Sequence, residues 1–167
     1  MREILNGNFF NPTCGNLSID EALKEMTHYM AEKPEKFYDI IVGCDSSSSE
    51  EPNFPLAIVI LRVGEGGRFF LKKINYHQLR KFYGWHQRIL EEVLLSCELA
   101  LFLRENLKEQ VPSSLNWQFR YIHADVGENG LTRDMIREVT GLIRGNGFEP
   151  KIKPESFAAS NVADRYS

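Results

Sequence analysis

The segment YDIIVGCD, residues 38–45, is a short apolar run with several β-branched residues that ends in an acid. This composition predicts a buried strand immediately ahead of Asp45. Two more strand-like runs follow, Leu56–Val63 and Arg68–Ile74, and the turn Gly64–Gly67 joins them. The sequence therefore predicts three consecutive strands in a meander, the first of which ends at an acid.

The second half of the chain predicts helices that alternate with strands. Apolar residues recur at helical spacing in three segments, and short strand-like runs separate these segments. The expected elements are a helix from about Trp85 to Lys108, a strand over Gln118–Ala124, a helix that Thr132 caps, a strand over Phe148–Ile152 and a closing helix over Ser156–Tyr166. From Tyr38 onward the order is then βββαβαβα, which is the order of the ribonuclease H fold.

One further helix is predicted ahead of this core. The capping box Ser18-Ile19-Asp20-Glu21 begins an amphipathic segment that ends near Lys33-Pro34. Because 167 residues with 43% hydrophobic content can bury one core, we expect a single domain over residues 1–167. We expect residues 1–36 to be an N-terminal helical extension and residues 37–167 to be the core. The predicted fold class is α/β, a ribonuclease-H-like mixed five-stranded sheet with an extra N-terminal helix.

The composition restricts what the protein can bind and where it works. With 20 basic and 23 acidic residues, the chain lacks the broad positive field of a protein that coats nucleic acid. Contact with nucleic acid is then expected to be local. The three cysteines are odd in number and far apart, which argues against a disulfide framework or a zinc ribbon. No leader sequence and no apolar run of the ~20 residues that span a bilayer is present, so we expect a cytoplasmic protein.

Four acids fall where the predicted topology brings segments together: Asp45, Glu92, Asp125 and Asp164. Asp45 and Asp125 leave the ends of the first and fourth strands, which are neighbours in this topology. Carboxylates that close repel one another and raise each other's pKa unless a cation neutralises them. Oxygen ligands without His or Cys suit Mg²⁺ or Mn²⁺, and two such ions about 3.5–4 Å apart can promote phosphodiester cleavage. The four acids are therefore the predicted metal ligands and catalytic residues.

Each of these acids also has a purely structural interpretation. Asp45 and Asp125 are strand-end acids, which can simply shape the turns that follow them. Glu91 and Glu92 point about 100° apart on a helix, so only one of them is expected to face the strands. Spacing alone does not separate a ligand at Glu92 from a solvated helix charge. Asp164 lies close to the end of the sequence, where a terminus can fray.

Basic and aromatic residues alternate between the third strand and the long helix. The expected nucleic-acid contacts are Lys72, Lys73, Arg80, Lys81 and Arg88, interleaved with Tyr76, Phe82, Tyr83 and Trp85. Cations can hold phosphates while aromatic faces stack on bases. The alternative is a solvated connection whose aromatic rings pack into the core. On the fourth strand, His123 is expected to be a hydrogen-bonded structural residue.

From about Phe10 to Ser167 the sequence also resembles the YkuK-like family of bacterial proteins, which is classed as ribonuclease-H-like. The most specific stretches are Val42–Ser46, Arg88–Glu92 with Ser96, His123–Gly127, and Ile152–Ser160 leading to Ala163-Asp164. The resemblance implies that the acidic site of the family falls on Asp45, Glu92, Asp125 and Asp164. Cys44 and Ser47 depart from the family pattern, which has Thr and Gln at these positions.

These features together predict a metal-dependent nuclease, or a related phosphodiester hydrolase, that binds Mg²⁺ or Mn²⁺ and acts on nucleic acid. The competing hypothesis is a non-catalytic nucleic-acid-binding or scaffold domain with the same fold. A third hypothesis is a phosphatase that acts on a small phosphate ester, for which a closed pocket is expected beside the acids in place of an open groove.

Overall fold

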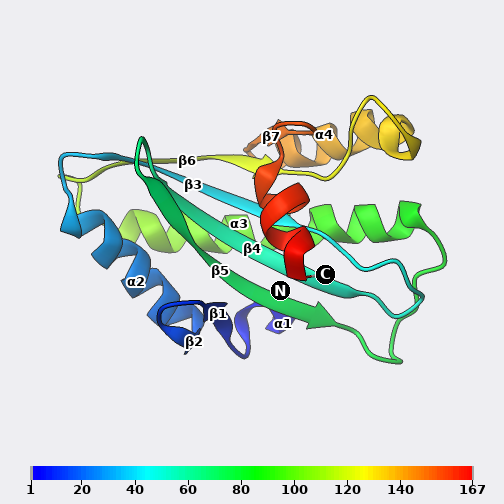
Figure 1. Ribbon diagram of the computed structural model, residues 1–167, viewed down its shortest axis with the longest axis horizontal. Coiled ribbons are helices and arrows are strands. Elements are labelled where there is room, and N and C mark those ends of the chain that lie inside the picture. The colour runs from blue at the N-terminus through cyan, green and yellow to red at the C-terminus, as the bar shows by residue number, and fades with distance from the viewer. Residues whose placement is uncertain (1, 167) are drawn as a thin grey trace.

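A seven-stranded mixed sheet runs through the computed structural model, which describes residues 2–166 (Figure 1). The strands are β1 (Phe9–Asn11), β2 (Gly15–Leu17), β3 (Phe37–Cys44), β4 (Asn53–Arg62), β5 (Gly66–Asn75), β6 (Asn116–His123) and β7 (Glu149–Lys151). Their spatial order is β2-β1-β5-β4-β3-β6-β7. The five strands from β3 to β7 therefore form the arrangement that the element order predicted.

Strand β3 lies at the centre of these five strands. It pairs antiparallel with β4, where Ile40 faces Ile60, and parallel with β6, where Val42 faces Ile122. Residues 40–45 are all buried, as expected for a strand covered on both faces. Because β3 and β6 are parallel neighbours, the residues that follow them lie at the same edge of the sheet.

Helices α2 (Ile19–Glu32), α3 (Trp85–Gln110) and α4 (Ile136–Gly145) contribute to the main hydrophobic core. The capping box predicted for α2 is present, because the Ser18 hydroxyl accepts from the backbone of Glu21 and the Glu21 carboxylate accepts from the backbone of Ser18. The long helix α3 packs along β3 on one face of the sheet, where leucines such as Leu99 and Leu103 are fully buried. A short helix α1 (Arg2–Leu5) contacts α3 and β5.

The C-terminal segment covers the opposite face of the sheet and crosses β3 and β4 (Figure 1). It consists of a π-helical turn, η2 (Ala158–Ala163), and a 3-10 turn, η3 (Asp164–Tyr166). The backbone of η2 approaches β3 closely, since a Cβ atom built on Gly43 would lie 2.6 Å from the nitrogen of Ala159. A glycine at position 43 therefore allows this crossing.

The predicted fold class is confirmed, and the structure corrects it in three places. The sheet has seven strands, not five, because residues 9–17 form the β1–β2 hairpin and β1 pairs with β5 at Phe10 and Leu71. Thr132 does not cap an α-helix: its hydroxyl accepts from the backbone of Gly127 at 3.0 Å, and the 3-10 turn η1 (Leu131–Met135) precedes α4. The closing helix is π-helical and 3-10, since it must bend across the sheet.

Within residues 2–166, no helix is both long enough and apolar enough to cross a membrane. Helix α3 has the length, but charged residues are spread along it.

Gly43→Ala should lower the free energy of unfolding by about 1–3 kcal/mol, because the added methyl group would overlap the backbone of η2. Urea denaturation measures this change. Gly141→Ala is the matched control, since Gly141 lies within α4 and nothing comes within 4 Å of a Cβ atom there. The control should gain up to about 1 kcal/mol from its higher helix propensity. Equal stability of Gly43→Ala and the parent would contradict the close crossing.

Candidate functional site

Asp45 lies at the centre of the candidate site, directly after β3. Its backbone nitrogen donates to the carbonyl of Pro55 at 3.2 Å, which keeps the residue at the sheet edge. The residue is only 6% exposed. Burial, then a side-chain hydrogen bond with Asp164 and the charge of Asp125, raises its pKa to about 7, against a smaller opposing effect from the backbone of Ser46. A carboxyl with these surroundings is poorly solvated as an anion.

Glu92 approaches the same edge from α3 and is 5% exposed. The hydroxyl of Ser46, the residue next to Asp45, donates to Glu92 Oε2 at 2.5 Å. Burial and, next, the charge of Asp45 raise the pKa of Glu92 well above its ordinary value, while Ser46 and Arg88 act in the opposite direction. Asp45 and Glu92 are thus two buried carboxyls that interact electrostatically and disfavour each other's charge.

Asp125 follows β6, the parallel neighbour of β3. Its Oδ1 atom accepts from the Ser160 hydroxyl at 2.9 Å and lies 3.2 Å from the Lys153 ammonium. The Asp125 side chain is 23% exposed. Its charge contributes to the raised pKa of Asp45 and of Glu92. Asp125 therefore lies close enough to Asp45 and Glu92 to affect their pKa values, and it forms an ion pair with the Lys153 side chain.

Asp164 reaches the site from the C-terminal segment and is exposed apart from its hydrogen bond with Asp45. Two contacts hold that segment in place. The hydroxyls of Ser156 and Ser160 are 2.7 Å apart, and the backbone nitrogen of Ala158 donates to His123 Nδ1 at 3.1 Å. Burial and the charge of Lys151 lower the pKa of His123 to about 4, which agrees with a neutral, hydrogen-bonded imidazole.

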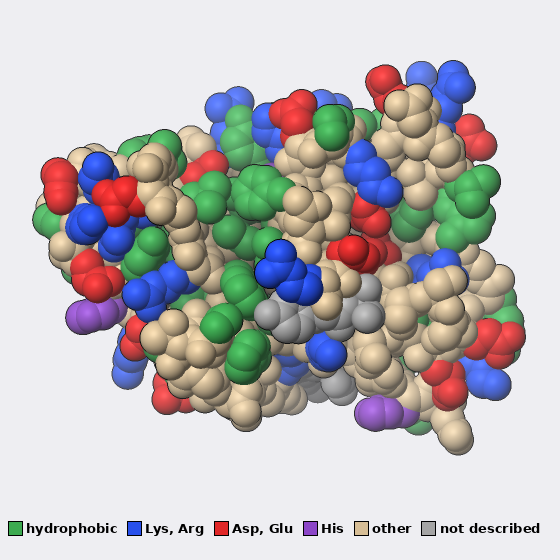
Figure 2. All heavy atoms as spheres, in the orientation of Figure 1, with side chains coloured by type: hydrophobic (Ala, Val, Ile, Leu, Met, Phe, Trp, Pro, Cys, Tyr) green, Lys and Arg blue, Asp and Glu red, His purple; other side chains and the backbone are tan. Residues whose placement is uncertain are grey.

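Asp45 interacts with each of the other three predicted acids, which come from α3, from the end of β6 and from the C-terminal turn. Figure 2 shows acidic and basic side chains next to one another near the middle of the face that carries the C-terminal segment. The donors are carboxylate and hydroxyl oxygens, which match the preference of Mg²⁺ and Mn²⁺. Among residues 2–166, however, no group of three or more Asp, Glu, His or Cys side chains is arranged so that it could hold a metal ion.

Glu91 is a buried acid whose role the sequence did not indicate. We expected only one of Glu91 and Glu92 to face the strands, but both are buried, at 6% and 5% exposure. Glu91 accepts from the hydroxyl of Tyr76 and forms a 3.0 Å ion pair with Arg80, so it holds the loop that follows β5. No local spacing in the sequence indicates this role, because the partners of Glu91 come from a loop ahead of α3.

The five predicted nucleic-acid contacts have different surroundings. Lys73 and Lys81 are exposed. Arg80 is engaged with Glu91 and stacks over the Phe82 ring at 4.7 Å. Lys72 is only 9% exposed, and its ammonium lies 5.9 Å from the Phe9 ring. Arg88 lies close enough to Glu92 to affect its pKa.

The aromatic residues of this region also differ in their surroundings, since some are buried and others are exposed. Phe82 is buried and packs edge-on against Phe54 with ring centroids 5.0 Å apart, whereas Tyr83 is 71% exposed. Trp85 stacks on His86 at 4.8 Å. The structural interpretation therefore holds for Phe82, which packs into the core, while Tyr83 is exposed.

The fold belongs to a known class. The chain is a member of the Ribonuclease H-like family, whose family model matches residues 21–167. It is similar to the "Uncharacterized protein YkuK" of Bacillus subtilis (strain 168), with 27% identity over 168 residues that cover 95% of this chain and 96% of that protein. No solved structure matches the sequence. The family establishes a nuclease-type fold.

Without a divalent cation, the stability of the protein should fall as the pH rises from about 4 to about 7. The pKa of Asp45 is about 7 in the folded state and about 3.9 when unfolded, so the folded state binds more protons in this window. The free energy of unfolding should then decrease by up to a few kcal/mol. Urea denaturation in EDTA at pH 5 and pH 8 measures the change.

Asp45→Asn should flatten this pH dependence, because the ionisable group is removed. Asp134→Asn, an exposed acid of η1, is the matched control and should keep the parent slope. A slope that Asp45→Asn leaves unchanged would show that another group produces it.

Proposed function

We propose that this protein is a divalent-metal-dependent nuclease, or a closely related phosphodiester hydrolase, with Asp45, Glu92, Asp125 and Asp164 as its metal ligands. The observation that carries the proposal is the burial of Asp45 and Glu92, two carboxyls at one sheet edge that interact with each other and with Asp125. Membership of a family with a nuclease-type fold supports the same conclusion.

Burial of several carboxyls next to one another costs free energy unless protons or cations compensate for their charge. In the ion-free protein, the hydrogen bond between Asp45 and Asp164 requires a shared proton, and Lys153 compensates Asp125. A divalent cation would replace both, because it neutralises more charge and accepts the oxygen ligands that these residues offer. When bound, the cation would lower the pKa of a water and stabilise the charge that develops on the phosphate oxygens.

The remaining residues of the site would orient the ligands. The Ser46 hydroxyl directs Glu92 toward Asp45, and the Ser160 hydroxyl fixes Asp125. Such hydrogen bonds to ligating carboxylates commonly contribute to metal affinity. Lys153 and Arg88 lie next to the acids and would hold the phosphate backbone of a nucleic acid substrate, together with the exposed Lys73 and Lys81.

A non-catalytic nucleic-acid-binding domain is the second candidate function. It is favoured by one observation, the 3.2 Å ion pair between Lys153 and Asp125, which satisfies one of the acids without a metal. In that case the four acids would need no metal ion to compensate for their charge, and divalent cations would bind weakly or not at all.

Cleavage of labelled single-stranded, duplex and hybrid oligonucleotides in Mg²⁺ or Mn²⁺ tests the proposed activity. Asp45→Asn and Asp125→Asn should each reduce cleavage to background, because each removes a charged ligand. Asp134→Asn changes an exposed acid on η1 that is not one of the four proposed ligands, and this variant should cleave like the parent. If the parent binds oligonucleotides but cleaves none of them with either ion, the binding domain replaces the nuclease.

Lys153→Met should strengthen Mn²⁺ binding several-fold, because the ammonium and the cation compete for the same oxygen of Asp125. Electron paramagnetic resonance of free Mn²⁺ measures the affinity independently of any cleavage. Lys151→Met is the matched control, since Lys151 pairs with Glu155, 3.3 Å away, and not with one of the four acids. Unchanged or weaker Mn²⁺ binding in Lys153→Met would mean that Asp125 is not a ligand.

A further inference from the structure

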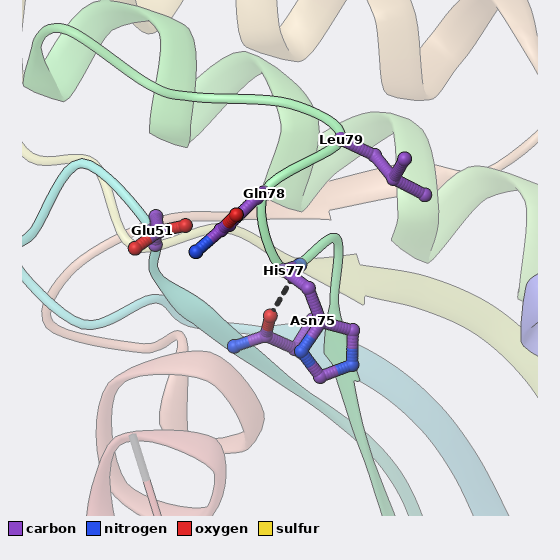
Figure 3. A pocket seen from close by; sticks show the side chains of 5 residues that line it. All are labelled: Glu51, Asn75, His77, Gln78 and Leu79. Atoms are coloured by element: carbon purple, nitrogen blue, oxygen red, sulfur yellow. Dashed lines mark hydrogen bonds between the residues drawn. The ribbon is translucent and has the colours of Figure 1, made fainter.

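Two adjoining hollows open at the end of β5 and share Asn75 and His77 as a common wall. The first has a volume of about 620 Å³ and is lined by Glu51, Asn75, His77, Gln78 and Leu79 (Figure 3). The second has a volume of about 460 Å³, and its lining includes Asn53, Lys72 and Lys73. Both volumes lie in the range of about 300–1,000 Å³ that small-molecule sites occupy.

The first hollow has the chemistry of a site for a neutral, polar, planar group. Its polar lining consists of two amides, an imidazole and one carboxylate, and no Lys or Arg lines it. Figure 3 shows Glu51 and Gln78 pointing toward one another, with His77 and Asn75 together on a neighbouring side and Leu79 turned away. Amides and a carboxylate hydrogen-bond to the edge of a nucleobase, whereas the carboxylate would repel a phosphate.

The second hollow has the opposite character, because Lys72 and Lys73 both line it. Lys73 is exposed, and Lys72 is held beside the Phe9 ring. Ammonium groups and an amide are suitable partners for a phosphate group. A base site and a phosphate site that share one wall correspond to the two ends of a single nucleotide.

The shared wall is held in place by hydrogen bonds that extend toward the acids. His77 has a φ of 52°, and its backbone nitrogen donates to Asn75 Oδ1 at 2.5 Å. Asn75 donates to Asn53 Oδ1 at 2.8 Å, and the backbone nitrogen of Asn53 donates to Ser47 Oγ at 2.9 Å. Ser47 lies two residues after Asp45, so the hollows are connected to the loop that leaves the acidic site. A positive φ outside glycine costs free energy, and such conformations concentrate at ligand sites.

We propose that the two hollows form a subsite for one unpaired nucleotide, with its base in the first hollow and its phosphate in the second. The inference rests on the proposed function and names its substrate class, single-stranded nucleic acid. In a duplex the Watson–Crick edge of each base is occupied by its partner and the base is held in the stack, so the first hollow cannot receive that edge.

Fluorescence anisotropy in EDTA tests the subsite without any cleavage. The probes are a labelled single-stranded oligonucleotide, a blunt duplex of the same sequence and a fully abasic strand of the same length. Gln78→Ala and His77→Gly should weaken binding of the intact strand about tenfold and leave the abasic strand unaffected. Glycine suits position 77 because it accepts the positive φ. Lys73→Ala should weaken binding of both strands.

Gln110→Ala and Lys108→Ala are the matched controls, since both residues are exposed near the end of α3. Both should bind like the parent, and the parent should bind the duplex at least tenfold more weakly than the single strand. The inference is overturned if Gln78→Ala and His77→Gly bind the intact strand like the parent, or if the duplex binds as tightly as the single strand. Intact binding without Mg²⁺- or Mn²⁺-dependent cleavage would overturn the proposed function and leave the subsite standing.

Discussion

The parallel pairing of β3 with β6 is the constraint on which the candidate site depends. It places the residues after Cys44 and after His123 at one edge of the sheet, although about 80 residues separate them in the chain. Asp45 follows β3 directly, and Asp125 follows β6 after one residue, Ala124, so the pairing of Gly43 with His123 brings the two acids together. The close crossing of η2 over Gly43 then brings Asp164 to the same edge from the opposite end of the chain.

Two adjacent acids of α3, Glu91 and Glu92, contact different parts of the structure near this edge. Glu92 faces Asp45 through Ser46, while Glu91 holds Tyr76 and Arg80 of the loop that follows β5. One turn of helix is thus attached both to the acidic site and to the loop beside the nucleotide-sized hollows. A shift of α3 would displace both together, and this gives the two sites a common rigid support.

The positions of β3, β4 and β5 could be predicted from the sequence to within three residues, because burial leaves a strong pattern in these strands. The β1–β2 hairpin could not, since each strand has only three residues and β1 gains its stability from pairing with β5. Acids at strand ends indicated where the site would form. The partners of those acids depend on tertiary contacts: the ion pair of Lys153 with Asp125 and the burial of Glu91 follow from no local spacing.

The contacts of Asp45 and Asp125 also explain how an edge with several acids remains folded. A proton shared between Asp45 and Asp164 and an ammonium beside Asp125 compensate for part of the negative charge. The shared proton and the Lys153 ammonium can both leave without a change of fold. Asp164 lies in an exposed terminal turn, and the Lys153 side chain is 46% exposed. Glu92 accepts from the Ser46 hydroxyl and has the charge of Arg88 nearby, yet burial and the charge of Asp45 still raise its pKa well above its ordinary value, so its burial is the strongest physical argument for the proposed cation site.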